Sequence, residues 1–348
     1  MSKNESKQLQ HFYIAQEQSI YLLSHKDATK LKTWVDLCQQ QLKQLDFEDV
    51  ALLGKGAYGF VFSGIKRKGN TETELPVVFK FSRINLPQHV QDRLADEADI
   101  QAQLNHPQIP VVIEYQKIKR QSILQMTRAP GIDLEQLSLQ VGPLSPELVV
   151  SIALQLADIL LYLRQANNHR QLKPIVHGDI KPSNLVYDKT TGKVQLIDWG
   201  SSVNAQMDCN NQSTSTNVME LMSSDLQHSN ARLGDVYFIG PEQLNGGLSS
   251  PRFDEQGLAA TLYAIASGQS CRYGHKVISP TSLGLPKVLA KVIEGILDDD
   301  VKISYKAGDY FFKQLDFFKK MVLAPTPTIS NIQPLIPIWH KYTKVDID

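Results

Sequence analysis

Two short stretches, HGDIKPSN at residues 177–184 and LIDWG at residues 196–200, constrain the fold of this chain more than any other part of its sequence. The first contains the carboxylate of Asp179 and the amide of Asn184, and the second contains the carboxylate of Asp198. Such oxygen donors suit Mg²⁺. Phosphoryl transfer needs divalent cations beside the phosphates and a carboxylate that orients the attacking hydroxyl. The pattern therefore predicts a fold in which both stretches meet at one phosphoryl-transfer site.

The charge balance and the cysteines limit the class of protein. The 348 residues are enough for two lobes, and 36 Lys plus Arg balance 36 Asp plus Glu, which gives no sign of a nucleic-acid or membrane-surface footprint. The first residues are polar and no run of about 18 apolar residues occurs, so we expect neither a signal peptide nor a membrane span. The cysteines, Cys38, Cys209 and Cys271, form no zinc or disulfide pattern, which favours a cytoplasmic location.

A glycine-rich segment, GKGAYGFV at residues 54–61, fits the pattern G-x-G-x-x-G-x-V. Glycines let the backbone approach phosphate oxygens closely, although a glycine-rich turn without a ligand fits the same pattern. Lys80 ends an apolar strand between Phe79 and Phe81, so the alternation favours an inward ammonium that needs an anion. Glu97 on the next predicted helix is the natural partner, and the competing interpretation is a solvated helix face.

The remaining pattern predicts a helical segment, a β-rich part and a larger helical part. Apolar residues recur at helical spacing within residues 1–48, with Asp27 as a plausible N-cap. Ser145 followed by Pro146 opens a long helix to about residue 166. Further predicted strands cover 50–53, 60–62, 77–81, 111–118 and 122–126, and further predicted helical regions cover 88–104 and 253–322. The polar segment 201–239 is too long for an ordinary connection, which indicates a functional loop.

These motifs occur in the order of one family. The chain resembles the eukaryotic-like protein kinases of the Ser/Thr type, including bacterial members, over about residues 49–320. The glycine-rich loop, strand lysine, helix glutamate, catalytic loop, Asp-x-Gly motif and Gly240-Pro241-Glu242 carry the resemblance. It implies an α+β, bilobal protein-kinase-like fold. The expected parts are a helical extension 1–48, an N-lobe 49–130, a C-lobe 131–322 with an activation segment 198–242, and a proline-containing tail 323–348.

The resemblance also implies a role for each catalytic residue. Asp179 corresponds to the base that accepts or orients the proton of the substrate hydroxyl, and Lys181 to the contact with the γ-phosphate. Lys80 corresponds to the lysine that holds the α- and β-phosphates, with Glu97 as its partner. The implied Mg²⁺ ligands, with Mn²⁺ as a possible substitute, are Asn184 and Asp198.

The ATP site implied by the resemblance spans the glycine-rich loop, the adenine pocket and the segment that joins the lobes. Met126 takes the gatekeeper position, and residues 127–129 form the hinge that meets the adenine. Asp254 matches the helix aspartate that anchors the catalytic loop. The implied nucleotide-binding residues are Gly54, Lys55, Gly56, Ala57, Tyr58, Gly59, Val61, Val78, Lys80, Met126, Thr127, Ala129, Asp133 and Val186.

Several positions depart from the family pattern. Gly178 replaces an arginine that grips an activation-loop phosphate in many relatives, which predicts activity without phosphorylation of that loop. Asp235 stands where a threonine is expected, and Gln101 replaces an apolar residue, which predicts a looser helix. Glu242 lacks its arginine partner, and Lys306 is the expected substitute. Trp199 for Phe keeps an apolar wedge.

Three functions compete. The leading interpretation is an ATP- and Mg²⁺-dependent kinase that acts on Ser or Thr of protein substrates. A small-molecule kinase of the aminoglycoside or choline type is the second interpretation, because such enzymes share His-Gly-Asp. They lack a lysine at the position of Lys181, and they lack a Gly-Pro-Glu segment. A pseudokinase scaffold is disfavoured because Lys80, Asp179, Asn184 and Asp198 are all present. The hydroxyl cluster in the polar loop predicts autophosphorylation at Ser213, Thr214, Ser215 or Thr216.

Overall fold

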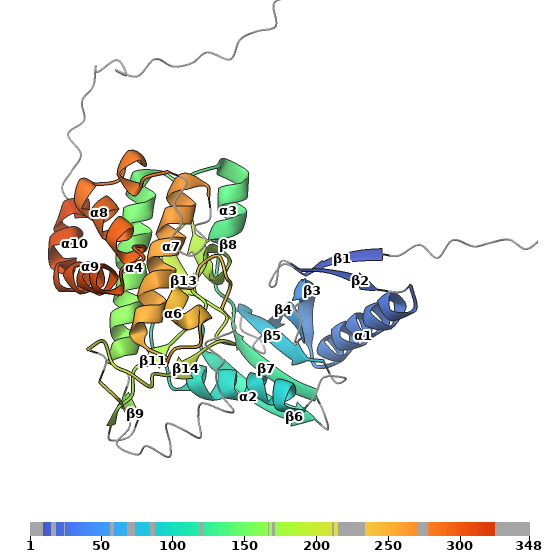
Figure 1. Cartoon of the computed structure of the whole chain (residues 1–348). Coiled ribbons are helices and arrows are strands. Elements are labelled where there is room, and N and C mark those ends of the chain that lie inside the picture. Colours follow the sequence, from blue (N-terminus) through green and yellow to red (C-terminus); the bar gives the residue numbers. More distant parts are fainter. Residues whose placement is uncertain are drawn as a thin grey trace, which may run out of the picture.

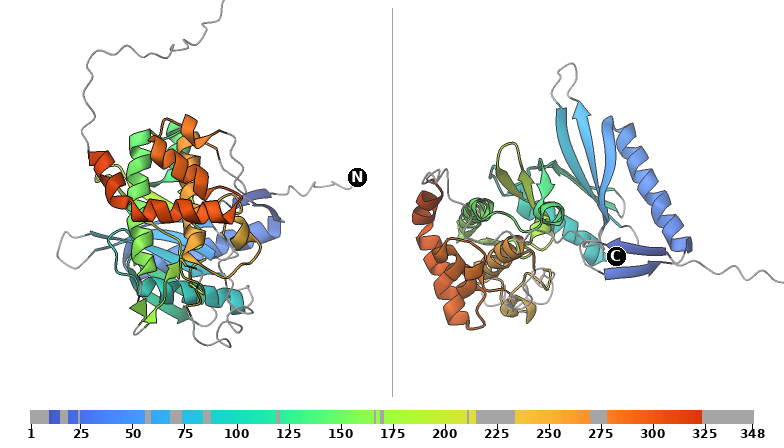
Figure 2. Two further views of the ribbon diagram at one scale, coloured as in Figure 1. Left: turned by 60° about the vertical axis from the view of Figure 1, so that its left-hand side comes forward. Right: turned by 90° about the horizontal axis from the view of Figure 1, so that it is seen from above.

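The computed structural model of this chain describes twelve ranges, and the statements below concern these residues. They are 10–14, 19–23, 25–55, 59–67, 74–83, 88–118, 121–165, 167–168, 171–210, 212–214, 234–269 and 278–323. A β-rich lobe and a larger helical lobe are visible in Figure 1, and the right-hand view of Figure 2 shows them side by side. Except for Leu323, the predicted tail 323–348 lies outside the described residues. The segments between the twelve ranges lie outside them as well.

The N-lobe is one antiparallel sheet with strand order β3-β4-β5-β7-β6. The strands are β3 (Phe47–Lys55), β4 (Gly59–Arg67), β5 (Glu74–Ser82), β6 (Val112–Ile118) and β7 (Gln121–Thr127). Helix α2 (Gln88–Ala102) packs against β7 and β6. Because side chains alternate along β5, Phe79 and Phe81 face one side of the sheet and Lys80 the other. The predicted strands and the helix 88–104 are confirmed.

Helix α1 (His25–Gln44) covers the face of the sheet that Phe79 and Phe81 occupy. Val35, Cys38 and Leu42 are buried there with the phenylalanines of β4 and β5. The predicted apolar stripe therefore packs on the sheet of the N-lobe. Two details of the prediction are wrong, because helix α1 begins before Asp27 and a hairpin of β1 (Gln10–Ile14) and β2 (Ser19–Leu23) precedes it.

Leu42 gives a direct test of this packing. Its side chain is 1% exposed, whereas Leu37 on the same helix is 55% exposed. We expect Leu42→Ala to lower the free energy of unfolding by about 2–5 kcal/mol, because buried methyl groups and their contacts are lost. Leu37→Ala should stay within about 0.5 kcal/mol of the wild type. Chemical denaturation of both variants measures this, and equal effects would show that α1 does not pack as described.

The C-lobe is built around α4 (Pro146–Arg164) and α7 (Pro251–Ser267). Around them lie α3 (Leu134–Val141), α6 (Pro241–Leu244), η3 (Pro280–Ser282), α8 (Lys287–Ile296), α9 (Val301–Lys313) and α10 (Leu315–Leu323). Ser145 caps α4 as predicted, because its hydroxyl accepts from the Leu148 N–H. The antiparallel sheet of the first lobe and the mostly helical second lobe confirm the predicted α+β bilobal fold.

Helix α4 qualifies the expectation that no segment could span a membrane. An 18-residue window of this 19-residue helix has a mean hydropathy of 1.6, which is high enough for a membrane span by length and composition alone. The helix is apolar because it runs through the core of the C-lobe. Its buried residues are Val149, Val150, Ile152, Ala153, Leu154, Leu156, Ala157, Ile159, Leu160 and Leu163.

Short strands carry the loops of the site. Strand β12 (Leu185–Asp188) pairs with β13 (Lys193–Leu196) on one side and with β8 (Ile132–Asp133) on the other, and β11 (Ile175–Val176) pairs with β14 (Val203–Asn204). A second small pair joins β9 (Asn167–Asn168) and β10 (Gln171–Leu172). The catalytic loop follows β11 and ends in η1 (Pro182–Asn184), and the Ile197 N–H donates to the Asn184 carbonyl at 2.9 Å, so residues 177–184 and 196–200 lie side by side.

Candidate active site

Lys80 joins the two lobes. From β5 its Nζ forms an ion pair with Glu97 of α2, and it lies 2.6 Å from Oδ1 of Asp198. Burial alone would raise the pKa of Asp198, but the Lys80 ammonium outweighs it and lowers that pKa from 3.8 to about 2. Burial raises the pKa of Glu97 despite the same ammonium. The predicted pair is therefore formed, and Asp198 is a third member that sequence spacing did not suggest.

Asp179 lies at the centre of a second group of charges. Lys181 Nζ is 2.9 Å from Asp179 Oδ2 and 3.9 Å from Asp235 Oδ2. The Asn184 amide donates to Asp179 Oδ2 at 3.0 Å, and the Asp235 N–H donates to Asp179 Oδ1 at 2.8 Å. Both oxygens of Asp179 are thus oriented by donors, which fixes the direction of the carboxylate. Burial raises the pKa of Asp235. The carboxylates of Asp235 and Asp179 share the ammonium of Lys181.

Asp254 of α7 fixes the catalytic loop, as the resemblance implies. Its carboxylate accepts from the N–H groups of His177 at 2.8 Å and Gly178 at 2.9 Å. Burial raises the pKa of Asp254 to about 6, although the two N–H groups act in the opposite direction. The His177 ring packs edge-on against Trp199, with the ring centroids 4.8 Å apart. Trp199 is fully buried, so it does form the apolar wedge expected of it.

The donor set fits Mg²⁺. The Asn184 nitrogen is used by Asp179, which leaves the amide oxygen for a cation, and Asp198 offers a carboxylate. Among the described residues no three His, Cys, Asp or Glu side chains gather as a metal site. Mg²⁺ usually keeps several waters and takes one or two carboxylates plus substrate phosphates. Two protein oxygens that require phosphate to complete the shell therefore suit Mg²⁺ bound with a nucleotide.

Strand register brings the predicted nucleotide-binding residues together. Val61 pairs with Lys80, Val78 with Met126, and Val186 with Asp133. Gly54 and Lys55 end β3, and Gly59 begins β4 where a Cβ atom would lie 2.0 Å from the carbonyl oxygen of Phe81. Only glycine fits at that position. The expected contacts of Gly56, Ala57 and Tyr58 lie outside the described residues.

The hinge refines the prediction for adenine binding. The N–H of Thr127 donates to the Val111 carbonyl at 2.9 Å, and the N–H of Arg128 donates to the Pro76 carbonyl at 3.1 Å. These two bonds use the N–H groups of Thr127 and Arg128. Ala129 is the predicted hinge residue whose N–H neither bond uses. Asp133 caps α3 by accepting from the Gln136 N–H through Oδ1.

The prediction that Lys306 pairs with Glu242 is wrong. Lys306 is exposed, and the Tyr305 hydroxyl instead donates to the Glu242 carboxylate at 2.9 and 3.0 Å from its two oxygens. The Arg252 guanidinium lies over the Tyr305 ring at 4.6 Å. Helical spacing points consecutive residues in different directions, so the neighbour of the expected residue reaches the carboxylate.

Tyr305→Phe tests this contact. Loss of hydrogen bonds to a charged carboxylate should lower the free energy of unfolding by about 1–3 kcal/mol. Tyr310→Phe is the matched control on the same helix, because Tyr310 is exposed, and it should change stability by less than about 0.5 kcal/mol. Urea unfolding distinguishes them, and a silent Tyr305→Phe would mean that Glu242 is held by other groups.

Gly178 is coupled to the activation segment without an arginine. Its carbonyl accepts from the Gln243 amide at 2.6 Å, and a Cβ at Gly234 would lie 2.6 Å from the same oxygen. Gln243 follows Gly-Pro-Glu, so a neutral hydrogen bond joins the end of this segment to the catalytic loop. Sequence reasoning missed Gln243, because a single glutamine carries no motif.

Gln101 does not loosen α2 as expected. Its side chain is buried, and its amide donates to the Pro110 carbonyl at 2.8 Å and lies 3.9 Å from the Met126 sulfur. The pair of Lys80 and Glu97 is formed nonetheless. Gln101 therefore ties α2 to Pro110 and to Met126 of β7.

The described part of the activation segment is bonded to the C-lobe. The Ala205 N–H donates to the Pro174 carbonyl at 2.7 Å, Arg252 donates to the Cys209 carbonyl at 2.6 Å, and within the segment the Thr214 hydroxyl donates to the Ala205 carbonyl at 2.5 Å. Ser213 lies opposite Met207 in an isolated bridge. The other two predicted autophosphorylation sites, Ser215 and Thr216, lie outside the described residues.

Comparison with known proteins agrees with this geometry. The family described as "Protein kinase domain" matches residues 47–321. This chain belongs to the protein kinase family. The serine/threonine-protein kinase PrkC of Bacillus subtilis (strain 168) is 26% identical over 187 residues, 54% of this chain and 25% of PrkC. The Aurora/IPL1-related protein kinase 2 of Caenorhabditis briggsae is 28% identical over 227 residues, 64% of this chain and 71% of the relative.

A third relative covers more of this kinase. The probable serine/threonine-protein kinase CPE1738 of Clostridium perfringens (strain 13 / Type A) is 23% identical over 299 residues, 82% of this chain. The chain spans about a quarter of PrkC and 39% of the Clostridium protein. These findings confirm the resemblance to eukaryotic-like Ser/Thr protein kinases.

Proposed function

We propose that this kinase transfers the γ-phosphoryl group of ATP to Ser or Thr hydroxyls of protein substrates, with Mg²⁺ as cofactor. The observation that carries the proposal is the contact of Lys181 with Asp179 at 2.9 Å. It places a cation beside the carboxylate that the acceptor hydroxyl must reach. Phosphoryl transfer depends on positioning and on electrostatic stabilisation, and this pair offers both.

Each group then has a defined task. Asp179 orients the acceptor hydroxyl and accepts its proton, since both of its oxygens are held in direction by donors. Lys181 stabilises negative charge on the transferred phosphoryl group. Lys80, held by Glu97, contacts the α- and β-phosphates. When bound, Mg²⁺ neutralises phosphate charge, and Asn184 and Asp198 are the residues that would hold it.

The remaining assignments rest on the sequence. We propose a cytoplasmic location because the cysteines form no disulfide framework. Protein substrates are proposed from the family and from Lys181, without an assigned nucleic-acid or membrane partner. Autophosphorylation is proposed within residues 201–239. Phosphopeptide mapping of the purified kinase that finds no modification there would contradict this last assignment.

The acceptor class is the part of the proposal that needs a direct test. Three peptides that differ only in a Ser, Thr or Tyr acceptor are incubated with labelled ATP and Mg²⁺, in parallel with an aminoglycoside and choline. Label on the Ser and Thr peptides, with little on Tyr, is expected. Label on the small molecules alone would assign the chain to small-molecule kinases, and ATP binding without any transfer would indicate a scaffold.

A further inference from the structure

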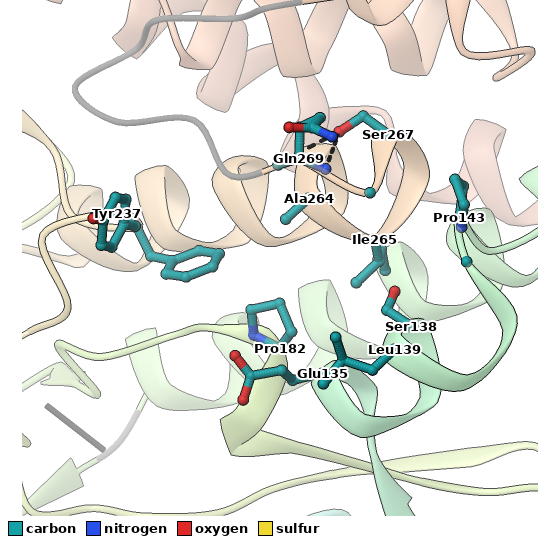
Figure 3. Close-up of a pocket in the computed structure, with 13 residues that line it drawn as sticks. Glu135, Ser138, Leu139, Pro143, Pro182, Tyr237, Ala264, Ile265, Ser267 and Gln269 are labelled. Atoms are coloured by element: carbon teal, nitrogen blue, oxygen red, sulfur yellow. Dashed lines mark hydrogen bonds between the residues drawn. The ribbon is translucent and has the colours of Figure 1, made fainter. Parts of the chain in front are cut away.

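A cavity of about 660 Å³ adjoins the catalytic loop (Figure 3). It lies between α3, the loop that follows α3, the catalytic loop and the last turns of α7. The lining residues are Glu135, Ser138, Leu139, Gly142, Pro143, Pro182, Tyr237, Phe238, Ala264, Ile265, Ser267, Gly268 and Gln269. A cavity of this size is typical of ligand sites, and it is large enough for a peptide segment.

The cavity begins where an acceptor hydroxyl must lie. Pro182 follows Lys181 directly, and Tyr237 lies two residues after Asp235. Lys181 and Asp235 both contact Asp179. An extended peptide advances about 3.3 Å per residue, so a chain that places its hydroxyl at Asp179 brings neighbouring side chains to the cavity.

The charge of the cavity has one sign. Glu135 is the only charged side chain among the described residues that line it. Figure 3 shows Glu135 at the same end of the cavity as Pro182 and Tyr237, which is the end near the catalytic loop. Burial raises the pKa of Glu135, the nearby carboxylates of Asp133 and Asp235 raise it further, and the Lys181 ammonium offsets this only in part. A cation in the cavity would relieve both effects.

Glu135 is held in place and forms no direct ion pair in the described ranges. It lies in the first turn of α3, which Asp133 caps and which Leu134 and Leu137 anchor in the core. No described Lys or Arg lies within 4.0 Å of its carboxylate. A glutamate in a first helical turn also interacts favourably with the helix dipole, but this does not require that it line a cavity.

A second polar atom in the cavity needs a donor. The Ser138 hydroxyl oxygen is buried and has no hydrogen-bond partner among the described residues. Ser138 lies three positions after Glu135 on α3, so both side chains lie on the same face of the helix. A guanidinium carries five N–H donors in a planar fork, and an ammonium carries three. Leu139, Pro143 and Phe238 offer apolar walls for an aliphatic stem.

We propose that this cavity binds an arginine of the substrate, close in sequence to the phosphorylated Ser or Thr, through Glu135 and Ser138. The inference rests on the proposed protein kinase function, because it names the class of peptide that the same site prefers. The Glu135 carboxylate pairs with the guanidinium, and the Ser138 oxygen accepts a further N–H. The aliphatic stem packs on the apolar walls.

The test compares serine peptides in which one position, scanned along an otherwise neutral sequence, holds Arg, Lys, Glu or Ala. The wild type should prefer the best Arg peptide over the Ala peptide by about tenfold or more in kcat/KM, mostly through KM. Glu135→Gln should bring that ratio close to one, and Glu135→Arg should reverse it in favour of Glu peptides. Glu147→Gln is the matched control, because Glu147 is exposed and lies outside the cavity.

Ser138→Ala tests the second contact. It should reduce the preference for Arg over Lys peptides by a few fold and leave the preference for Lys over Ala in place. Equal loss of activity toward all peptides in Glu135→Gln would overturn the proposal, because it would show a structural role alone. An unchanged ratio in that variant would overturn it as well.

A binding measurement separates this proposal from the proposed function. Fluorescent Arg and Ala peptides that carry Ala in place of the acceptor serine are titrated into the full chain with a non-hydrolysable ATP analogue. Tighter binding of the Arg peptide, abolished by Glu135→Gln, supports the subsite even if no phosphate is transferred to any peptide. Equal binding of both peptides by the wild type would overturn the subsite, whatever the kinase activity.

Discussion

Replacing Lys80 by Met should remove nearly all phosphoryl transfer and destabilise the fold. The ammonium contacts both Glu97 and Asp198, so its loss leaves the buried Glu97 and the partly buried Asp198 without this cation. Breaking a buried ion pair costs about 3–5 kcal/mol. The lost contact to phosphate should lower kcat/KM by about a hundredfold or more. Steady-state kinetics and urea unfolding measure the two effects.

The pH dependence of stability gives this prediction a distinctive sign. In the wild type, the pKa of Asp198 is lowered from 3.8 to about 2. The unfolded state binds the proton more readily, so this carboxylate stabilises the fold above pH 3.8, and the contribution is lost as pH falls toward 2. In Lys80→Met, the largest contribution that opposes burial is lost, so burial should raise the pKa of both carboxylates relative to the wild type. The variant should therefore regain stability, relative to the wild type, as pH falls from about 7 to about 5.

The control for Lys80 is a lysine in an exposed ion pair. Lys117 lies 3.0 Å from Asp92, and both side chains are more than 40% exposed. Lys117→Met should change stability by less than about 1 kcal/mol and should leave activity intact. If Lys80→Met were no more damaging than Lys117→Met, the pair of Lys80 with Glu97 and Asp198 would not be the junction of the two lobes.

Asp254→Ala should be the most damaging substitution away from the reacting groups. It leaves the N–H groups of His177 and Gly178 buried without their acceptor, at about 1–3 kcal/mol each. Because the catalytic loop loses its anchor, kcat should fall by about a hundredfold, as expected for a misplacement of about 1 Å. Asp254→Asn keeps one oxygen acceptor and should be intermediate.

This effect should also depend on pH. The pKa of Asp254 is raised from 3.8 to about 6, so the folded state binds its proton more readily than the unfolded state. Asp254 therefore favours the fold most at low pH, and that contribution declines as pH rises through 6. The loss of stability in Asp254→Ala should be larger at pH 5 than at pH 7, by roughly 1 kcal/mol or more. Asp158→Ala, in an exposed pair with Lys319, should show neither effect, and a pH-independent loss in Asp254→Ala would contradict the described burial.

The sequence motifs predicted the contacts between residues whose positions are fixed by the spacing of those motifs. Lys80 and Glu97 meet because strand alternation and helix position both follow from local pattern. Asp254 anchors the catalytic loop as the resemblance implied. These residues are predictable because each stands at a fixed position in a recognisable motif.

Contacts between distant single residues were not predictable. Gln243 reaches the Gly178 carbonyl, and Tyr305 reaches Glu242, but neither residue belongs to a periodic or spaced pattern. The direction of a side chain on a helix decides between Tyr305 and Lys306, and composition does not reveal that direction. The hairpin that precedes α1 was missed because its strands, QHFYI and SIYLL, are short apolar runs that periodicity alone does not distinguish from helix.

These unpredicted contacts show how the catalytic loop is joined to the activation segment although Gly178 replaces the arginine. In place of an arginine that grips a phosphate, Gln243 and the Asp235 N–H join the activation segment to the catalytic loop. Neither hydrogen bond requires a phosphoryl group. This arrangement supports the prediction that the kinase is active without phosphorylation of its activation segment.

The central claim is that Asp179 serves a protein kinase reaction, and the most direct measurement is transfer of labelled γ-phosphate from ATP to a generic basic protein with Mg²⁺. The wild type should label the protein on Ser or Thr. Asp179→Asn should lower the rate by about 10²- to 10⁴-fold while ATP still binds, because the carboxylate that takes the proton is gone. Undiminished labelling of the protein by Asp179→Asn would contradict the account.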